Sequence, residues 1–107
     1  MLAQVNSVNH INAGENFIAD IEATLRNKLD RFSPRLTRIE LHLRDVNADS
    51  NVGDDKHCTI EARPEGLAPV TVTDAATTIP NAISGATAKL IVALERTFGK
   101  LNSRKGH

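Results

Sequence analysis

The sequence predicts an α+β domain with the element order β-α-β-β-β-α, in which a four-stranded sheet carries two helices on one face. Apolar residues recur every three to four positions in 15–32 and in 78–101, which is typical of amphipathic helices. Apolar and polar residues alternate in the segments between them, which is typical of strands with one buried face. Because both helices and these strands each have one apolar face, the simplest packing is two layers.

The N-terminal part predicts a strand followed by a helix. Residues 2–8 (LAQVNSV) alternate weakly, which favours a strand at the edge of the sheet. In 15–32 the acids precede the bases, an order that suits the helix dipole. The proline of Ser-Pro-Arg ends this helix, since a residue before proline avoids the helical conformation. Its apolar stripe consists of Ile18, Ile21, Leu25, Leu29 and Phe32.

Three strands and a second helix are predicted in the remainder, at 36–44, 57–63, 69–73 and 78–101. The strands direct inward Ile39, Leu41, Leu43, Cys58, Ile60, Ala62, Val70 and Val72, and they direct His42 and His57 to the solvated face. Thr78 can cap the second helix, and Pro80 suits its first turn. Its apolar side is formed by Ile79, Ala82, Ile83, Ala86, Leu90, Leu94 and Leu101.

The 107 residues predict one domain over 1–101 and a flexible tail over 102–107. The first residues show no signal peptide, and no apolar stretch is long enough to cross a bilayer. A single cysteine excludes an internal disulfide. We therefore expect a cytoplasmic protein that has no membrane partner.

The stretch DVNADSNVGDDKHC begins with the oxygen-ligand spacing of a calcium loop. Such a loop needs glycine at its sixth position and a bidentate glutamate at its twelfth. Ser50 and Lys56 occupy these positions, and the flanking residues alternate like strands. A polar loop between antiparallel strands is the better interpretation, because Asn, Asp, Ser and Gly favour turns.

His57 and Cys58 do not predict catalysis or a metal site. Successive side chains of a strand point to opposite faces, so these two cannot form a nucleophile–base pair. One cysteine with scattered histidines does not give a zinc pattern, and Cys58 is predicted to be a small core residue. We expect no enzyme activity, no cofactor and no small-molecule substrate.

The charges cancel in sum but are segregated along the chain. Residues 26–44 carry six bases against two acids, and 75–107 carry five bases against Glu95. Such local blocks can bind phosphate even when the whole chain is neutral. The alternative is ordinary solvated charge at the surface.

The sharpest candidate site is basic and lies on the two helices. Lys89, Arg96 and Lys100 fall within about 40° of one another around the last helix. Lys28 and Arg31 lie to one side of the first helix's apolar stripe. If the helices pack side by side, these flanks would form one groove suited to the backbone of structured RNA.

The ordered segments NKLDRF, RIELHLRD, DDKHCTIEARPEG and AISGATAKLIVALERTFGKL resemble the ribosome hibernation-promoting factor and ribosome-associated inhibitor family over nearly the whole chain. This resemblance implies a fold like that of double-stranded RNA-binding domains. It also implies binding between the head and body of the small ribosomal subunit, which keeps the ribosome inactive under stress. Lys28, Lys89, Arg96 and Lys100 match basic positions that contact RNA in the family.

The chain resembles the short, single-domain members, and we expect a monomer off the ribosome. Two other functions stay open from the sequence. One is a module that binds structured RNA outside the ribosome, and the other is a protein-interaction adaptor of the same fold.

Overall fold

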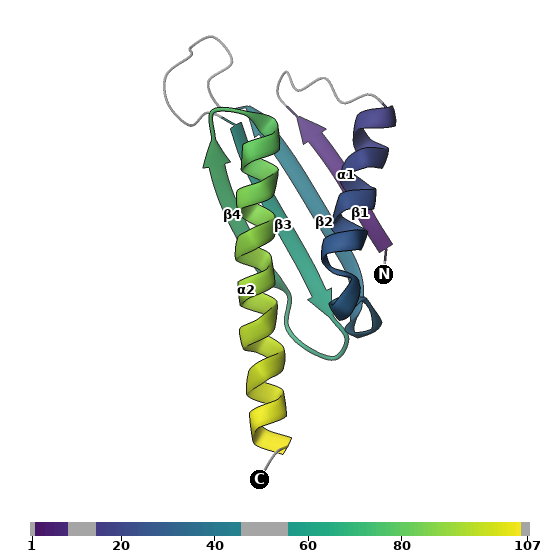
Figure 1. Cartoon of the computed structure of the whole chain (residues 1–107), viewed down its shortest axis with the longest axis vertical. Coiled ribbons are helices and arrows are strands. Elements are labelled where there is room, and N and C mark those ends of the chain that lie inside the picture. Colours follow the sequence, from purple (N-terminus) through teal and green to yellow (C-terminus); the bar gives the residue numbers. More distant parts are fainter. Residues whose placement is uncertain (1, 9–14, 46–55, 106–107) are drawn as a thin grey trace.

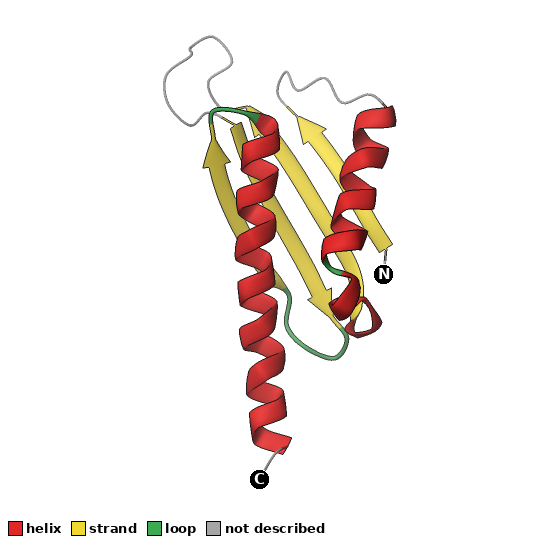
Figure 2. Cartoon of the chain, viewed as in Figure 1, coloured by secondary structure: helices red, strands yellow, loops and turns green. Residues whose placement is uncertain are grey.

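The computed structural model describes residues 2–8, 15–45 and 56–105, with only the backbone described for residues 7, 8, 15 and 100–105. The predicted order β-α-β-β-β-α is confirmed (Figures 1 and 2). The elements are β1 (Leu2–Val8), α1 (Glu15–Lys28), the 3-10 helix η1 (Asp30–Arg35), β2 (Leu36–Asp45), β3 (Lys56–Pro64), β4 (Val70–Ala76) and α2 (Ile79–Lys105).

The strands form one mixed sheet in the order β1-β2-β3-β4. β1 pairs with β2 in parallel, because α1 crosses from the end of one strand to the start of the other. β2, β3 and β4 pair antiparallel. The register sets Leu41, Ile60 and Val72 in one row across the sheet, so a single face collects the apolar side chains.

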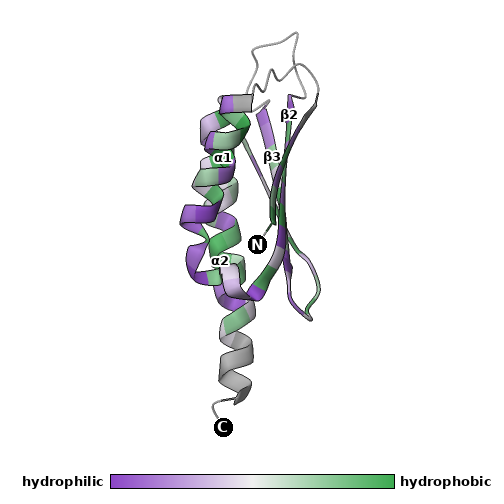
Figure 3. Ribbon diagram, turned by 90° about the vertical axis from the view of Figure 1, so that its right-hand side faces the viewer, coloured by the Kyte–Doolittle hydropathy of each residue, from purple (hydrophilic) through white to green (hydrophobic). Residues whose placement is uncertain are grey.

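Both helices cover the same face of the sheet (Figure 3). α1 packs on β1, and α2 packs on β3 and β4. The core between the layers includes the predicted inward residues Ile39, Leu41, Leu43, Cys58, Ile60 and Ala62. No described element covers the other face, which carries polar side chains such as Glu40, His42 and Thr59.

The first helix ends earlier than predicted. α1 stops at Lys28, and the chain continues as η1 up to Arg35. At the end of α1, Leu29 N–H donates to Leu25 O, four residues back, at 2.9 Å, as in an α-helix. In η1, Phe32 N–H donates to Leu29 O, three residues back, at 2.9 Å, as in a 3-10 helix. Pro34 explains the change, since it has no N–H to donate and disfavours α-helical geometry before it. Arg31 and Arg35 belong to η1, directly after the end of α1.

The second helix continues to Lys105, past the predicted end at Leu101. The added residues contain no helix breaker, and Arg104 and Lys105 suit the negative end of the helix dipole. The boundary between a domain over 1–101 and a flexible tail over 102–107 stays a prediction, but the helix crosses it. Figure 1 shows this end of α2 extending past the sheet.

Two buried residues of α2 were missing from the predicted apolar side. Phe98 is 5% exposed and stacks on Phe32, with ring centroids 5.8 Å apart. Thr87 is 2% exposed and satisfies its hydroxyl by donating to the Ile83 carbonyl at 2.7 Å. The predicted core residue Leu101 has a side chain outside the described part.

Candidate nucleic-acid interface

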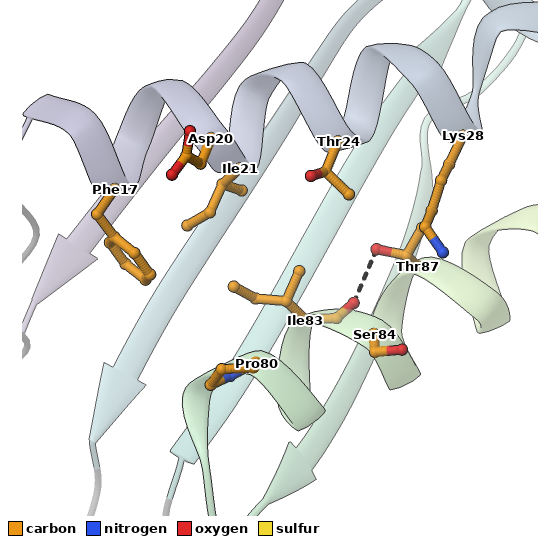
Figure 4. A pocket seen from close by; sticks show the side chains of 9 residues that line it. All are labelled: Phe17, Asp20, Ile21, Thr24, Lys28, Pro80, Ile83, Ser84 and Thr87. Atoms are coloured by element: carbon orange, nitrogen blue, oxygen red, sulfur yellow. Dashed lines mark hydrogen bonds between the residues drawn. The ribbon is translucent and has the colours of Figure 1, made fainter.

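Lys28 lies at a cleft between the two helices. It is the last residue of α1, and its exposed side chain lines a cavity of about 330 Å³ between α1 and α2. In Figure 4 it extends toward Thr87 on the opposite helix. The rest of the lining is mainly apolar or uncharged, with Asp20 as the exception; it comprises Phe17, Asp20, Ile21, Thr24, Pro80, Ile83, Ser84 and Thr87. Lys28 therefore supplies the positive charge of this cleft.

Arg31 continues the positive charge onto η1. Its guanidinium lies 4.6 Å above the ring of buried Phe32, and its Nη2 lies 3.4 Å from Oε2 of Glu95 on α2. The two charged side chains are 59% and 51% exposed, so water screens this ion pair and it contributes little to stability. A phosphate group can compete with Glu95 for Arg31.

Arg35 is a third cation of this region and is not among the predicted site residues. Its guanidinium carbon lies over the ring of Phe98, 4.0 Å from the centroid. Lys28, Arg31 and Arg35 recur at intervals of three and four residues, a spacing that could have suggested a common surface. We call these three residues the η1 surface.

Lys89 does not join the η1 surface, so the predicted single groove is wrong. Its ammonium group lies 2.9 Å from Oδ1 of Asp74 and donates to the carbonyl of Thr73 at 3.0 Å. Both partners belong to β4, on the side of α2 opposite to α1. The side of α2 that faces α1 carries Ser84, Thr87 and Glu95 instead. A helix has two flanks, and periodicity alone does not show which one a neighbouring helix meets.

Arg96 lies on the same flank as Lys89. Arg96 follows Lys89 by seven residues, which places the two side chains within about 20° of each other around the helix. The Arg96 side chain is exposed. Lys100 lies in α2, but its side chain is outside the described part. Uncharged and exposed Ala88 and Val92 separate this flank from Glu95. We call Lys89 and Arg96 the β4-side surface.

Asp74 is held as an anion by its contact with Lys89. The hydrogen bond from Lys89 lowers the pKa of the Asp74 carboxyl, although partial burial opposes this shift. Close packing also requires Gly85, because a Cβ there would overlap the Asp74 carboxylate. Asp74 and Lys89 thus join β4 to α2, and this pairing reduces the charge that Lys89 offers to a ligand.

Cys58 is the predicted core residue, with no exposed surface. Burial, and secondarily the negative charge of Asp74 opposite it on β4, raise the pKa of its thiol to about 12. A thiol that stays protonated at neutral pH is a poor nucleophile and a poor metal ligand.

The ends of the calcium-like stretch are neutralised by each other. Lys56 Nζ lies 3.2 Å from Oδ2 of Asp45, its partner in the β2–β3 register. The residues at the first and twelfth positions of the calcium-like stretch, Asp45 and Lys56, therefore form an ion pair. Residues 46–55 between them lie outside the described part. Among the described residues, no group of three or more His, Cys, Asp or Glu side chains is placed to hold a metal ion.

A family model decides the classification of the chain. The model described as Sigma 54 modulation protein / S30EA ribosomal protein matches residues 4–102. The chain belongs to this family. The predicted relationship to ribosome hibernation-promoting factors is thereby confirmed, and the family is associated with ribosome binding and translation regulation.

Two solved structures are similar to this family member in fold. The Thermus thermophilus Protein Y N-terminal domain has a TM-score of 0.72 at 15% identity, covering 91% of this chain and 99% of its own. A ribosomal subunit interface protein from Coxiella burnetii has a TM-score of 0.68 at 11% identity, covering 92% and 99%. No curated protein sequence matches the chain. The described helices include none with the length and apolar character needed to span a membrane.

Proposed function

We propose that this protein binds the small ribosomal subunit through ribosomal RNA and keeps the ribosome inactive during stress. The family match over residues 4–102 carries this proposal. The description of the Coxiella burnetii relative as a ribosomal subunit interface protein supports the choice of partner. The protein would act in the cytoplasm as a monomer, by occupying a site and without catalysing a reaction.

The η1 surface is the best candidate for the main RNA contact. Lys28, Arg31 and Arg35 are exposed and follow one another around the junction of α1 and η1. Lys and Arg side chains bind phosphate oxygens, and counterion release adds to their affinity. The two rings beneath the arginines, Phe32 and Phe98, are buried, so they support the cations and cannot stack on bases themselves. This arrangement favours contact with a structured RNA backbone.

The β4-side surface would provide a weaker, second contact. Arg96 is exposed and available, whereas Lys89 must exchange Asp74 for a phosphate group. Exchanging one anion for another gains less free energy than neutralising a solvated charge, because the Asp74 carboxylate is left behind. We therefore propose that Arg96 contributes more to binding than Lys89.

Co-sedimentation with isolated small subunits over a series of salt concentrations tests the proposal. RNA-backbone binding should weaken steeply and linearly on a logarithmic salt scale. A cell-free translation assay should show inhibition at the protein concentrations that saturate the subunit. Absence of the protein from the subunit pellet at low salt would refute the proposal.

The same experiment separates the two other functions. A module for other structured RNA would bind an unrelated RNA duplex as tightly as the small subunit. An adaptor with an apolar interface would show little salt dependence, because no counterions are released. Either result would leave the family assignment intact and change the proposed partner.

A further inference from the structure

A second cavity, outside the cleft between the helices, lies beside Arg35. It has a volume of about 400 Å³, within the range of small-ligand sites. Three segments that are distant in sequence form it: η1, the turn between β3 and β4, and α2. Its lining residues are Pro34, Arg35, Glu65, Gly66, Leu67 and Phe98.

Backbone hydrogen bonds fix the shape of this cavity. Leu67 N–H donates to Pro64 O at 3.3 Å across a turn in which Gly66 has φ +75°, a left-handed conformation that glycine adopts without strain. Glu65 N–H donates to Arg35 O at 2.9 Å, which fastens the turn to η1. The walls are therefore in place before a ligand binds, which lowers the entropic cost of binding.

The walls of the cavity suit a flat, partly polar ring. The Arg35 guanidinium carbon lies 4.0 Å from the centroid of the Phe98 ring, and Arg35 is exposed and lines the cavity, so a second planar group can pack on the guanidinium from the cavity side. Bases of single-stranded RNA commonly stack on guanidinium planes in this way. Leu67 is 37% exposed and offers an apolar contact. The Glu65 carboxylate can accept hydrogen bonds only.

We propose that this cavity binds an unpaired guanine of RNA, stacked on Arg35 and hydrogen-bonded to Glu65. Guanine is the RNA base whose Watson–Crick edge presents two adjacent N–H donors, at N1 and at the 2-amino group, and a carboxylate can accept both. Adenine and cytosine each place a ring acceptor beside their single amino group, and uracil flanks its one donor with carbonyl oxygens. These acceptors would face the carboxylate and repel it.

This site extends the proposed function from backbone contact to recognition of a base. It rests on the proposed function only for the source of the RNA, an unpaired ribosomal nucleotide beside the η1 surface. The base site shares Arg35 with the η1 surface, but the paired hydrogen bonds use Glu65, which cannot contact phosphate. Selectivity among the four bases therefore reports on this site alone, and it can be tested without ribosomes.

The test uses guanosine 5′-monophosphate as the probe, with ¹H–¹⁵N NMR of the whole chain as the readout. Saturable shifts should concentrate at the amides of Gly66 and Leu67. Adenosine, cytidine and uridine monophosphates should bind at least tenfold more weakly. Glu65→Gln, which exchanges one acceptor for a donor at an exposed position, should weaken guanosine monophosphate binding at least tenfold. Arg35→Lys, which keeps the charge and loses the plane, should weaken it severalfold.

A matched control is the pair Glu61 and Arg63 on the uncovered face of the sheet, where Arg63 Nη2 lies 3.1 Å from Glu61 Oε1. Glu61→Gln and Arg63→Lys should leave guanosine monophosphate binding unchanged. Equal shifts with all four nucleotides, shifts spread over the surface, or insensitivity to Glu65→Gln would overturn the guanine site. Ribosome co-sedimentation is scored separately, so a loss of subunit binding with guanine binding intact would refute the partner and support the site.

Discussion

Asp74 of β4 and Lys89 of α2 are in direct contact, with Oδ1 and Nζ 2.9 Å apart. The Lys89 ammonium group also donates to the carbonyl of Thr73, and Gly85 gives the carboxylate room against the helix. A residue that was expected to contact RNA thus has a structural role. Charge reversal at Lys89 would place a second anion beside Asp74 and would confuse loss of folding with loss of binding.

The pH dependence of stability should show this contact. The hydrogen bond from Lys89 holds the pKa of Asp74 below its ordinary value of 3.8, so the folded state binds this proton less readily than the unfolded chain. Its stabilisation is therefore complete above pH 3.8 and is lost as the pH falls through the lowered pKa. We expect Asp74→Asn to be less stable than the parent at pH 6, with a difference that shrinks below pH 3.8 in urea titrations. Lys89→Met should remove the same pH dependence of the free energy of unfolding, because Asp74 then has no ammonium partner.

Two glycines of α2 provide a matched test of the packing at Asp74. Alanine is favoured over glycine inside a helix by about 0.8–1 kcal/mol. Among the described residues, no atom outside the adjoining helix backbone lies within 4 Å of a Cβ built at Gly99, so Gly99→Ala should raise the free energy of unfolding by roughly that amount. Gly85→Ala should lower it, because the new Cβ would displace the Asp74 carboxylate from Lys89. In an Asp74→Ala background, Gly85→Ala should become stabilising, and the absence of that reversal would count against the contact.

The strands and their inward residues could be predicted because a sheet with one buried face has a strict period of two. A shift by one residue would expose Leu41 and Ile60, so the pattern determines the register. The rotation of α2 could not be predicted in this way. The rotation of α2 depends on the close approach of Asp74 on β4 to Gly85 on α2. Neither the period of the strand nor the period of the helix shows that these two residues meet.

The cavity beside Arg35 shows the same limit of sequence reasoning. The cavity is lined by three separate segments, which contribute Arg35 from η1, Glu65 from the turn after β3 and Phe98 from α2. The residues next to each of them in sequence give no sign of a binding site. Their convergence follows from the bend at Pro34 and from the hydrogen bond between Glu65 N–H and Arg35 O. Phe98 is not among the predicted core residues, although it continues the apolar side of α2 four residues after Leu94.

Cys58 should be unreactive in the folded protein and important for stability. With no exposed surface and a pKa raised to about 12, it should resist a disulfide reagent at pH 8 until denaturant is added. Between its ordinary pKa of 9.0 and about 12, the unfolded thiol ionises and the folded one does not. Stability should therefore fall as the pH rises through this range, and Cys58→Ala should reduce that fall.

Cys58→Ser should lower the free energy of unfolding by about 1–3 kcal/mol, because it places a hydroxyl in the apolar core without a hydrogen-bond partner. The fraction that remains folded should co-sediment with small subunits as the parent does. A fully stable variant that no longer binds would show that the thiol has a functional role.

Glu95→Gln should strengthen binding to ribosomal RNA. Glu95 competes with phosphate for Arg31, and both side chains are more than half exposed, so little stability is at risk. Removing the carboxylate also removes its repulsion of the RNA backbone. We expect a gain of severalfold in subunit affinity at low salt, fading at high salt. Glu61→Gln, on the uncovered face of the sheet, is the control and should change affinity little; an equal gain there would indicate a general effect of net charge.

The final prediction ranks the η1 surface against the β4-side surface. The double variant Lys28→Gln with Arg31→Gln should remove two phosphate contacts, each worth about 1.5–3 kcal/mol. It should therefore weaken subunit binding a hundredfold or more. Neutralising Lys89 and Arg96 in the same way should cost less, because Lys89 is already paired with Asp74.

Salt dependence gives the ranking a second readout. Each lost phosphate contact should reduce the slope of log affinity against log salt by about 1. The slope should therefore fall by about 2 for the Lys28 and Arg31 variant and by about 1 for the Lys89 and Arg96 variant. Circular dichroism should first confirm that both variants are folded, and Glu61→Lys on the uncovered face should leave the slope unchanged. If the Lys89 and Arg96 variant instead shows the larger loss in both affinity and slope, Lys89 leaves Asp74 on binding and the β4 side of α2 is the main RNA contact.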